Sequence, residues 1–129
     1  MRVDIRPGPA AGFVKFSCQI GDGVGRWSGG EEWSEGRFDV EFDVGLPVRW
    51  PAIEVLEPPV IDHLEVSSVD PLLVDVVGQV MDCDEAGVLS LAIGLTNLLL
   101  DTEGNPILEV VGQRVRVTGL AFELFRYEL

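Results

Sequence analysis

The sequence has one histidine, two cysteines and nine lysines and arginines among 129 residues, and each shortage excludes a class of site. His63, Cys18 and Cys83 stand in no metal-ligand spacing, so no zinc site is expected. No apolar run approaches the roughly 18 residues of a membrane helix. Phosphate-binding, dinucleotide-binding and nucleophile-elbow motifs are absent. The sequence predicts no enzyme activity, no catalytic residue, no metal and no cofactor.

Two clusters of polar residues are weaker signals than they look. The segment Asp82–Gly87 resembles the start of a calcium loop, but Ala86 and Ile93 stand where that loop needs oxygen ligands, so a tight turn is expected. His63 follows Asp62 directly, and neighbours in an extended strand point to opposite faces, so Asp62 is badly placed to orient a general base. Both clusters are interpreted as structural.

The second shortage is positive charge. Twenty-two aspartates and glutamates give a formal net charge of −13. Such a surface repels phosphate backbones and anionic membranes, which excludes nucleic acid and membranes as partners. It suits a soluble protein, or one with a basic partner. The first 13 residues lack the apolar core of a signal peptide, which favours a cytoplasmic, reducing location and leaves open whether Cys18 and Cys83 pair.

What the sequence has is turns. Fifteen glycines and eight prolines separate short apolar runs, and no tract is long enough to be a flexible linker. We expect a single all-β domain over residues 1–129, built from short antiparallel strands as a small barrel or sandwich.

The central element is a hairpin over Leu72–Gly94, rich in β-branched residues, with a turn at Asp82–Gly87. Apolar residues on both faces indicate that its strands are covered on two sides. The rival interpretation is a helix over Ala86–Leu100, which Gly94 and the flanking turns disfavour.

Two segments alternate between apolar and polar residues, Val14–Ile20 and Arg37–Val44. If they pair, Lys15 and Arg37 offset part of the acidic row, which consists of Asp39, Glu41 and Asp43. The row is interpreted as a solvated face that keeps an edge from pairing with another copy, or as a docking surface for a basic partner. Met1–Ile5 is expected to be a short edge strand.

Between these strands lies Gly21–Gly36, whose six glycines are taken to forbid a regular element. The segment holds Trp27 and Trp33 beside three glutamates, Glu31, Glu32 and Glu35. Either the indoles fold over the open end of the sheet as a lid, or the segment is a recognition loop with aromatic anchors ringed by carboxylates.

Further strands are expected at Ile53–Leu56, Ile61–Val66 and Leu95–Leu100, and in two pieces around Gly119 after Gln113. The proline-rich segment before the hairpin is expected to pass from one sheet to another. From Val74 to Leu129, a glycine-bent strand (VVGQV), a short turn and a final strand pair (GQRVRVTG, LAFELF) resemble an OB-type barrel. This resemblance implies a fold and no activity.

Two functional hypotheses follow. The first is a non-enzymatic, acidic protein-interaction module, of the size and charge of an immunity or inhibitor protein, that binds a basic partner. Its candidate residues are Trp27, Glu31, Glu32, Trp33, Glu35, Asp39, Glu41 and Asp43. The alternative is a small-molecule-binding β-barrel with Trp50, Phe122 and Phe125 lining a pocket. Edge pairing of strands would also allow a homodimer.

Overall fold

A computed structural model of the protein describes residues 1–28, 34–104 and 109–126. It confirms the predicted class, an all-β single domain with 62% strand. Five strands form a closed mixed barrel, and the others pack outside it. Within the described residues, no helix is long and apolar enough to cross a membrane.

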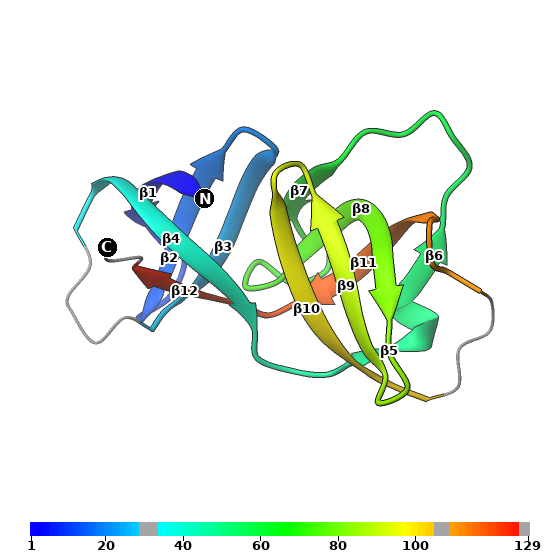
Figure 1. Ribbon diagram of the computed structural model, residues 1–129. Coiled ribbons are helices and arrows are strands. Elements are labelled where there is room, and N and C mark those ends of the chain that lie inside the picture. The colour runs from blue at the N-terminus through cyan, green and yellow to red at the C-terminus, as the bar shows by residue number, and fades with distance from the viewer. Residues whose placement is uncertain (29–33, 105–108, 127–129) are drawn as a thin grey trace.

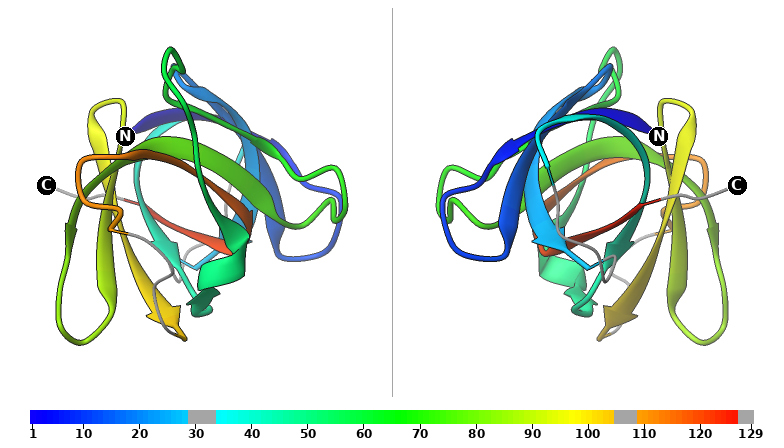
Figure 2. Two further views of the ribbon diagram at one scale, coloured as in Figure 1. Left: turned by 90° about the vertical axis from the view of Figure 1, so that its right-hand side faces the viewer. Right: turned by 90° about the vertical axis from the view of Figure 1, so that its left-hand side faces the viewer.

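The barrel combines the first four strands of the chain with the last one (Figure 1, left). Its strands are β1 (Arg2–Pro7), β2 (Phe13–Cys18), β3 (Gly21–Trp27), β4 (Gly36–Val44) and β12 (Phe122–Arg126). β1 pairs antiparallel with β2 and with β4, and β2 pairs antiparallel with β3. β12 closes the ring, because it pairs antiparallel with β4 and parallel with β3. The side views in Figure 2 show the curvature of the strands.

The position of β1 corrects a prediction and rules out a pairing. β1 was expected at an edge, and a direct pairing of Val14–Ile20 with Arg37–Val44 was considered. Instead β1 lies between β2 and β4, and Ile20 belongs to the turn after β2. The physical reason is burial, since Val3 and Ile5 alternate inward and are 1% and 2% exposed.

β3 overturns the expectation that Gly21–Gly36 contains no regular element. Its glycines make room for large neighbours inside the barrel. A Cβ atom on Gly23 would lie 2.3 Å from Cζ of Phe16, and one on Gly25 would lie 2.3 Å from Cδ1 of Leu124. Glycine is therefore required in this strand by close packing.

The remaining strands surround the predicted hairpin, which is confirmed as β8 and β9 (Figure 1, right). They are β5 (Val48–Arg49), β6 (Ile53–Val55), β7 (His63–Val66), β8 (Val74–Cys83), β9 (Val88–Ile93), β10 (Thr96–Glu103) and β11 (Arg114–Leu120). A 3-10 turn, η1 (Trp50–Ala52), joins β5 to β6. The segment expected to be a helix in the rival interpretation forms β9 and β10.

These strands repeat the pairings of the barrel. β8 pairs antiparallel with β9 and β11, and β9 with β10, as β1 does with β2 and β4, and β2 with β3. β5 pairs parallel with β10, and β6 pairs antiparallel with β11, as β12 does with β3 and β4. We call β8, β9, β10, β11 and β5–β6 the second set.

The registers match as well as the directions. Phe13 pairs with Arg26 in the barrel, and Val88 pairs with Asp101 in the second set, each 75 positions later. Gly12 precedes β2 with a φ of 80°, and Gly87, also 75 positions later, precedes β9 with a φ of 83°. The carbonyl of each of these glycines accepts a hydrogen bond of 3.0 Å from the strand alongside. The chain therefore contains two structurally equivalent halves.

The two halves exchange their fifth strands. After β4 the chain crosses to complete the second set with β5–β6, and after β11 it crosses back to complete the barrel with β12. The OB-type resemblance assigned LAFELF to the same barrel as β8–β11, whereas the structure places that segment in the other half. The exchange buries Phe122 and Leu124, which are 2% and 0% exposed, in the barrel.

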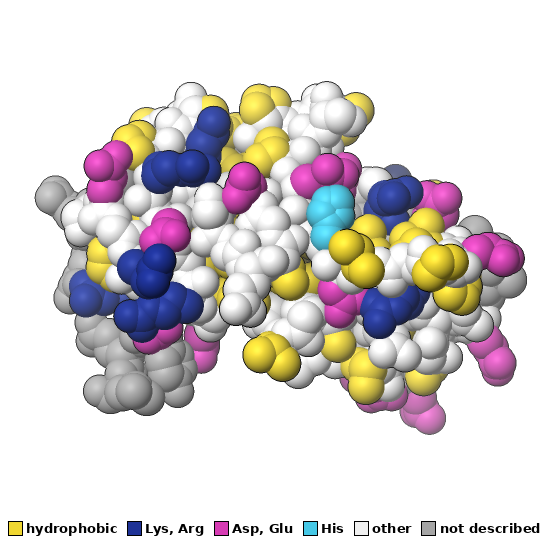
Figure 3. All heavy atoms as spheres, turned by 90° about the horizontal axis from the view of Figure 1, so that it is seen from above, with side chains coloured by type: hydrophobic (Ala, Val, Ile, Leu, Met, Phe, Trp, Pro, Cys, Tyr) yellow, Lys and Arg dark blue, Asp and Glu magenta, His cyan; other side chains and the backbone are white. Residues whose placement is uncertain are grey.

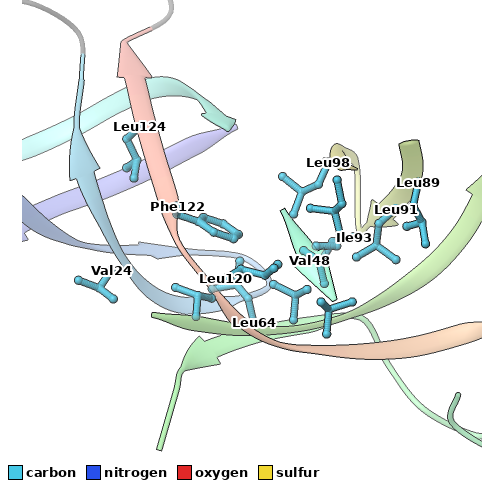
Figure 4. Packing of buried hydrophobic residues seen from close by; sticks show 14 of the residues in the cluster. Val24, Val48, Leu64, Leu89, Leu91, Ile93, Leu98, Leu120, Phe122 and Leu124 are labelled. Carbon is cyan, nitrogen blue, oxygen red and sulfur yellow. The ribbon is translucent and has the colours of Figure 1, made fainter. Parts of the chain in front are cut away.

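One hydrophobic core extends through both halves. Figure 4 shows Phe122 and Leu124 beside the barrel strands, Leu120 and Leu64 in the middle, and Leu91 and Leu98 beyond them. β7 has no counterpart in the barrel, and it lies between the halves, antiparallel to β8 and bridged to β3. The segment before the hairpin, which was expected to pass from one sheet to another, instead adds β5, β6 and β7 to one continuous sheet.

Candidate functional site

The outer face of the barrel carries the predicted acidic row. Phe38, Val40 and Phe42 of β4 pack into the core cluster, which leaves Asp39, Glu41 and Asp43 exposed on the other side. Asp39 forms an ion pair across the sheet, because its Oδ2 lies 3.4 Å from Nη1 of Arg2 on β1. The part of the row near Asp39 is therefore an ordinary surface charge ladder.

Asp4 and Arg37 extend that ladder with a second ion pair, in which Nε of Arg37 lies 3.2 Å from Oδ1 of Asp4. Compensation across the ladder was predicted, although its partners sit on β1 and not on β2. Figure 3 shows this mixture from above, with Lys and Arg side chains next to Asp and Glu over the barrel.

The other end of the row has a neighbouring cation, Arg26, which lies beside Glu123 in the parallel β3–β12 pair and whose guanidinium lies over the ring of Phe13. Across the antiparallel β4–β12 pair, Asp43 lies opposite Glu123, and Glu41 lies opposite Phe125. These four residues share the outer side of the sheet, because Phe122 and Leu124 alternate inward. No ion pair joins Glu41, Asp43 or Glu123 to a cation of the described chain. We call Glu41, Asp43, Glu123 and Phe125 the acidic face.

The interpretation that the acidic row protects a free strand edge is wrong. β4 pairs on both sides, with β1 and β12, so it has no free edge for its carboxylates to protect. Glu123 was missed as a site residue, and Phe125 was assigned to a pocket, although the alternation in LAFELF places both on the face opposite to Phe122 and Leu124. The docking and solvation interpretations of the row remain.

The tryptophan segment lies only partly within the described residues. Trp27 is half-buried at the end of β3 and packs edge-on against Phe38, with ring centroids 6.0 Å apart. This contact agrees with the lid interpretation for that indole. Glu35 is exposed before β4, at the end of the strand away from Asp43. Glu31, Glu32 and Trp33 lie outside the described residues.

The aromatic residues of the alternative hypothesis do not converge on one pocket. Phe122 fills the barrel, with its ring centroid 6.1 Å from that of Phe16 and 5.3 Å from that of Phe42. Trp50 is 5% exposed in η1, and Phe125 belongs to the acidic face. Phe122 therefore fills the barrel interior with other aromatic side chains, and the pocket described next is lined by none of the three residues.

A pocket of about 760 Å³ does exist outside the barrel, between the start of β1, the β2–β3 turn and the β9–β10 turn. The two turns lie side by side in Figure 1, and a Cβ atom on Gly94 would lie 2.9 Å from Cγ2 of Ile20. The pocket is lined by Met1, Arg2, Val3, Asp4, Ser17, Cys18, Gln19, Ile20, Arg37, Gly94, Leu95 and Thr96. Its volume is in the range of ligand sites, roughly 300–1,000 Å³.

The reactive side chains of the described chain show no catalytic arrangement. Cys18 and Cys83 are both free thiols. Burial raises the pKa of the Cys18 thiol, and burial with the nearby charges of Asp84 and Asp82 raises the pKa of Cys83, so both favour the unreactive neutral form. In the described residues, no group of three or more His, Cys, Asp or Glu side chains could hold a metal ion.

His63 contacts Glu65, with Nε2 lying 3.5 Å from Oε2, and Asp62 binds elsewhere. The imidazole lies at the surface among hydrophobic and charged neighbours (Figure 3). The two carboxylates beside His63 in the sequence therefore have separate structural roles.

Comparison of the chain with protein-family models, with curated proteins and with solved structures finds no match.

Proposed function

We propose that the protein is a non-enzymatic binding module that uses the acidic face to dock a basic protein partner. The observation that carries this proposal is the in-register placement of Asp43 and Glu123 beside Glu41, without an ion pair to a cation of the described residues. Arg26 of β3 lies beside Glu123, but its guanidinium lies over the ring of Phe13. Like charges directly opposite each other destabilise an antiparallel pair. A cationic partner would relieve that repulsion on binding.

Phe125 gives the face an apolar centre. It is partly exposed and lies opposite Glu41, with Glu123 two positions before it on the same side of β12. Aromatic residues are enriched at the centre of protein interfaces, and the rim around them is polar. The partner we expect carries lysine or arginine around an apolar residue.

Net charge alone does not select this face. Residues 45–120 hold 12 of the acidic residues against three arginines, so most of the negative charge lies outside the barrel. A partner drawn only by bulk charge would bind there as well. The proposal requires that the partner binds the acidic face itself. It is therefore tested with two variants of equal net charge, one changed on the acidic face and one changed elsewhere.

The experiment uses three baits in a cell lysate. The first is the unchanged protein, and the second carries Glu41→Gln, Asp43→Asn and Glu123→Gln. The third carries Glu57→Gln, Glu85→Gln and Glu103→Gln at exposed positions of the more acidic region. Both variants have a net charge of −10 in place of −13.

A basic protein retained by the first and third baits but lost from the second supports the proposal. Equal loss from both variants shows attraction by net charge only and contradicts it. Equal retention by all three removes the acidic face from the function. Thermal unfolding of each bait confirms that the variants are folded before the comparison.

A further inference from the structure

The pocket between the β2–β3 and β9–β10 turns is the counterpart of a site that the chain fills itself in its other half. That filled site holds the segment Asp62–Leu64. The carboxylate of Asp62 accepts hydrogen bonds from the guanidinium of Arg114 and, at 2.8 Å, from the backbone N–H of Gly94. The segment is thus anchored by its acidic side chain.

The backbone of the same segment is held as an added strand. His63 pairs with Val77, and Leu64 with Val76, at the start of β8. On its other side, the N–H of Leu64 donates to the carbonyl of Ile20 at 2.8 Å. Gly21 lies beside Leu64 there, in a parallel bridge. The segment is therefore bound by one carboxylate contact and two backbone edges.

The matching registers of the two halves identify the counterpart of each of these residues. Arg114 pairs with Gln79 in the second set as Arg37 pairs with Asp4 in the barrel. The residues that hold the segment are Arg114, Gly94, Val77, Val76, Ile20 and Gly21, and their counterparts in the same order are Arg37, Gln19, Arg2, Met1, Leu95 and Thr96. All of these counterparts line the pocket. The pocket therefore repeats the seat of Asp62–Leu64.

The chemistry of the seat is retained at these positions. Arg37 uses Nε for Asp4, which leaves its terminal nitrogens as donors. Asp4 stands where the second set has Gln79, whose amide donates to the carbonyl of Gly112 and not to a carboxylate. Arg2 adds a second guanidinium at the place of Val77. Arg2 also pairs with Asp39, and Asp4 itself lines the pocket, so each guanidinium already has one carboxylate partner and offers its remaining donors to an incoming carboxylate.

The backbone edge is also present. β1 pairs with β2 from Asp4 onward, so within the described chain no strand lies beside Met1–Val3 on that side. In the other half, the equivalent edge of β8 is occupied, because residues 74–77 pair with β7 and the residues from Gln79 onward pair with β9. An open strand edge beside a charged pocket binds extended peptides by strand addition.

We propose that this pocket binds an extended peptide segment of a partner protein that carries an aspartate or glutamate. The carboxylate binds Arg37 and the N–H of Gln19, and the following residues pair with Met1–Val3 on one side and meet Leu95 on the other. This site is separate from the acidic face, and it recognises the opposite charge. Its failure or success therefore leaves the proposed function unchanged.

The test uses the chain's own segment as the probe. A labelled heptapeptide with the sequence of residues 60–66, VIDHLEV, is titrated into the protein and followed by fluorescence polarisation. A second peptide, VINHLEV, replaces the anchoring carboxylate with an amide. We expect saturable binding of the first peptide and a dissociation constant about tenfold higher for the second, because hydrogen bonds to charged groups are lost. Equal binding of the two peptides overturns the proposal.

Three variants locate the binding. Arg37→Gln should weaken VIDHLEV about tenfold, whereas the exposed β1 substitution Arg6→Gln, outside the pocket, should leave it unchanged. Loss of binding on Arg114→Gln with retention on Arg37→Gln means that the peptide has displaced β7 from its own seat, which contradicts the proposal. If Arg37→Gln fails to fold, the two peptides on the unchanged protein still decide the question.

A capped single aspartate separates a peptide site from a general carboxylate site. N-acetyl-aspartate amide has the anchoring group without the residues that pair with β1. We expect it to bind far more weakly than the heptapeptide. Binding as tight as that of VIDHLEV would exclude strand addition and overturn the proposal.

Discussion

Asp43 lies directly opposite Glu123 on the outer side of the barrel, so two carboxylates face each other in one antiparallel pair. Neither has a cation of the described chain within ion-pair distance. A surface built only for stability would place opposite charges there, as it does at Arg2 and Asp39. The contrast between these two cross-strand pairs is the main reason to assign function to this face.

The first prediction concerns stability. Glu123→Gln should raise the free energy of unfolding by roughly 0.2–1 kcal/mol, since it removes the like-charge pair with Asp43, while Arg26 on its other side makes no ion pair with Glu123. The gain should shrink at high salt, because surface charges are screened. Urea unfolding at low and high salt measures both effects, with Glu103→Gln as an exposed control. A loss of stability at low salt would show that Glu123 makes a favourable contact.

The sequence predicted the parts of the fold that local pattern controls. The alternation of β4 and the hairpin of β8 and β9 follow from spacing and turn residues over short stretches. β3 was missed because its glycines are required by the packing of Phe16 on the neighbouring strand and of Leu124, about 100 residues later in the chain, which no local pattern shows. β1 was predicted at an edge because its second neighbour, β4, begins only at Gly36, and a pairing over that sequence separation leaves no local pattern.

The equivalence of the two halves was also not predicted. The strand pairings are the same in both halves, but most equivalent positions carry different residues. Phe16 and Gly23 in the barrel correspond to Leu91 and Leu98 in the second set. The barrel fills this space with one large residue, Phe16, opposite a glycine, whereas the second set fills it with two leucines of intermediate size. The sequence shows the equivalence at Ala11-Gly12 and Ala86-Gly87, two identical dipeptides 75 positions apart before β2 and β9.

The pairing of Phe16 with Gly23 gives the second prediction. Gly23→Ala should destabilise the protein by about 1–3 kcal/mol, because the new methyl group enters the space of the Phe16 ring. The effect should be much smaller in a Phe16→Leu background. Chemical denaturation of the four proteins of this double-mutant cycle measures the coupling.

Gly45→Ala serves as the control, since its Cβ would meet only the flexible end of Glu123, at 3.1 Å. We expect its stability to change by less than about 0.5 kcal/mol. Equal destabilisation by Gly23→Ala in both backgrounds would mean that Phe16 does not set the requirement for glycine.

The third prediction concerns the anchor of β7. Asp62→Asn should destabilise the protein by about 1–3 kcal/mol, because the Arg114 guanidinium loses its charged acceptor. Arg114→Gln should have a similar effect, and the double variant should cost little more than either single one. Thermal unfolding measures all three. Additive effects would show that the two residues act separately.

The fourth prediction concerns thiol reactivity. Because the pKa values of Cys18 and Cys83 are raised, both thiols should react with iodoacetamide at pH 7–8 well below the rate of the unfolded chain. A thiol whose pKa is raised by folding binds its proton more tightly in the folded state. Its contribution to stability is present below the unfolded pKa and is lost as pH rises through the folded one. Mass spectrometry of the labelled protein at several pH values measures the labelling rate of each thiol. Fast labelling of Cys18 at pH 7 would contradict the prediction of slow reaction.

The most direct measurement of the central claim is the association rate of the captured basic partner with the two variants of equal net charge. It is recorded by stopped flow over a range of salt concentrations. The acidic-face variant (Glu41→Gln, Asp43→Asn, Glu123→Gln) should associate several-fold more slowly than the control variant at low salt, and the two rates should converge as salt is added. Identical rates at every salt concentration would show that the acidic face does not guide the partner.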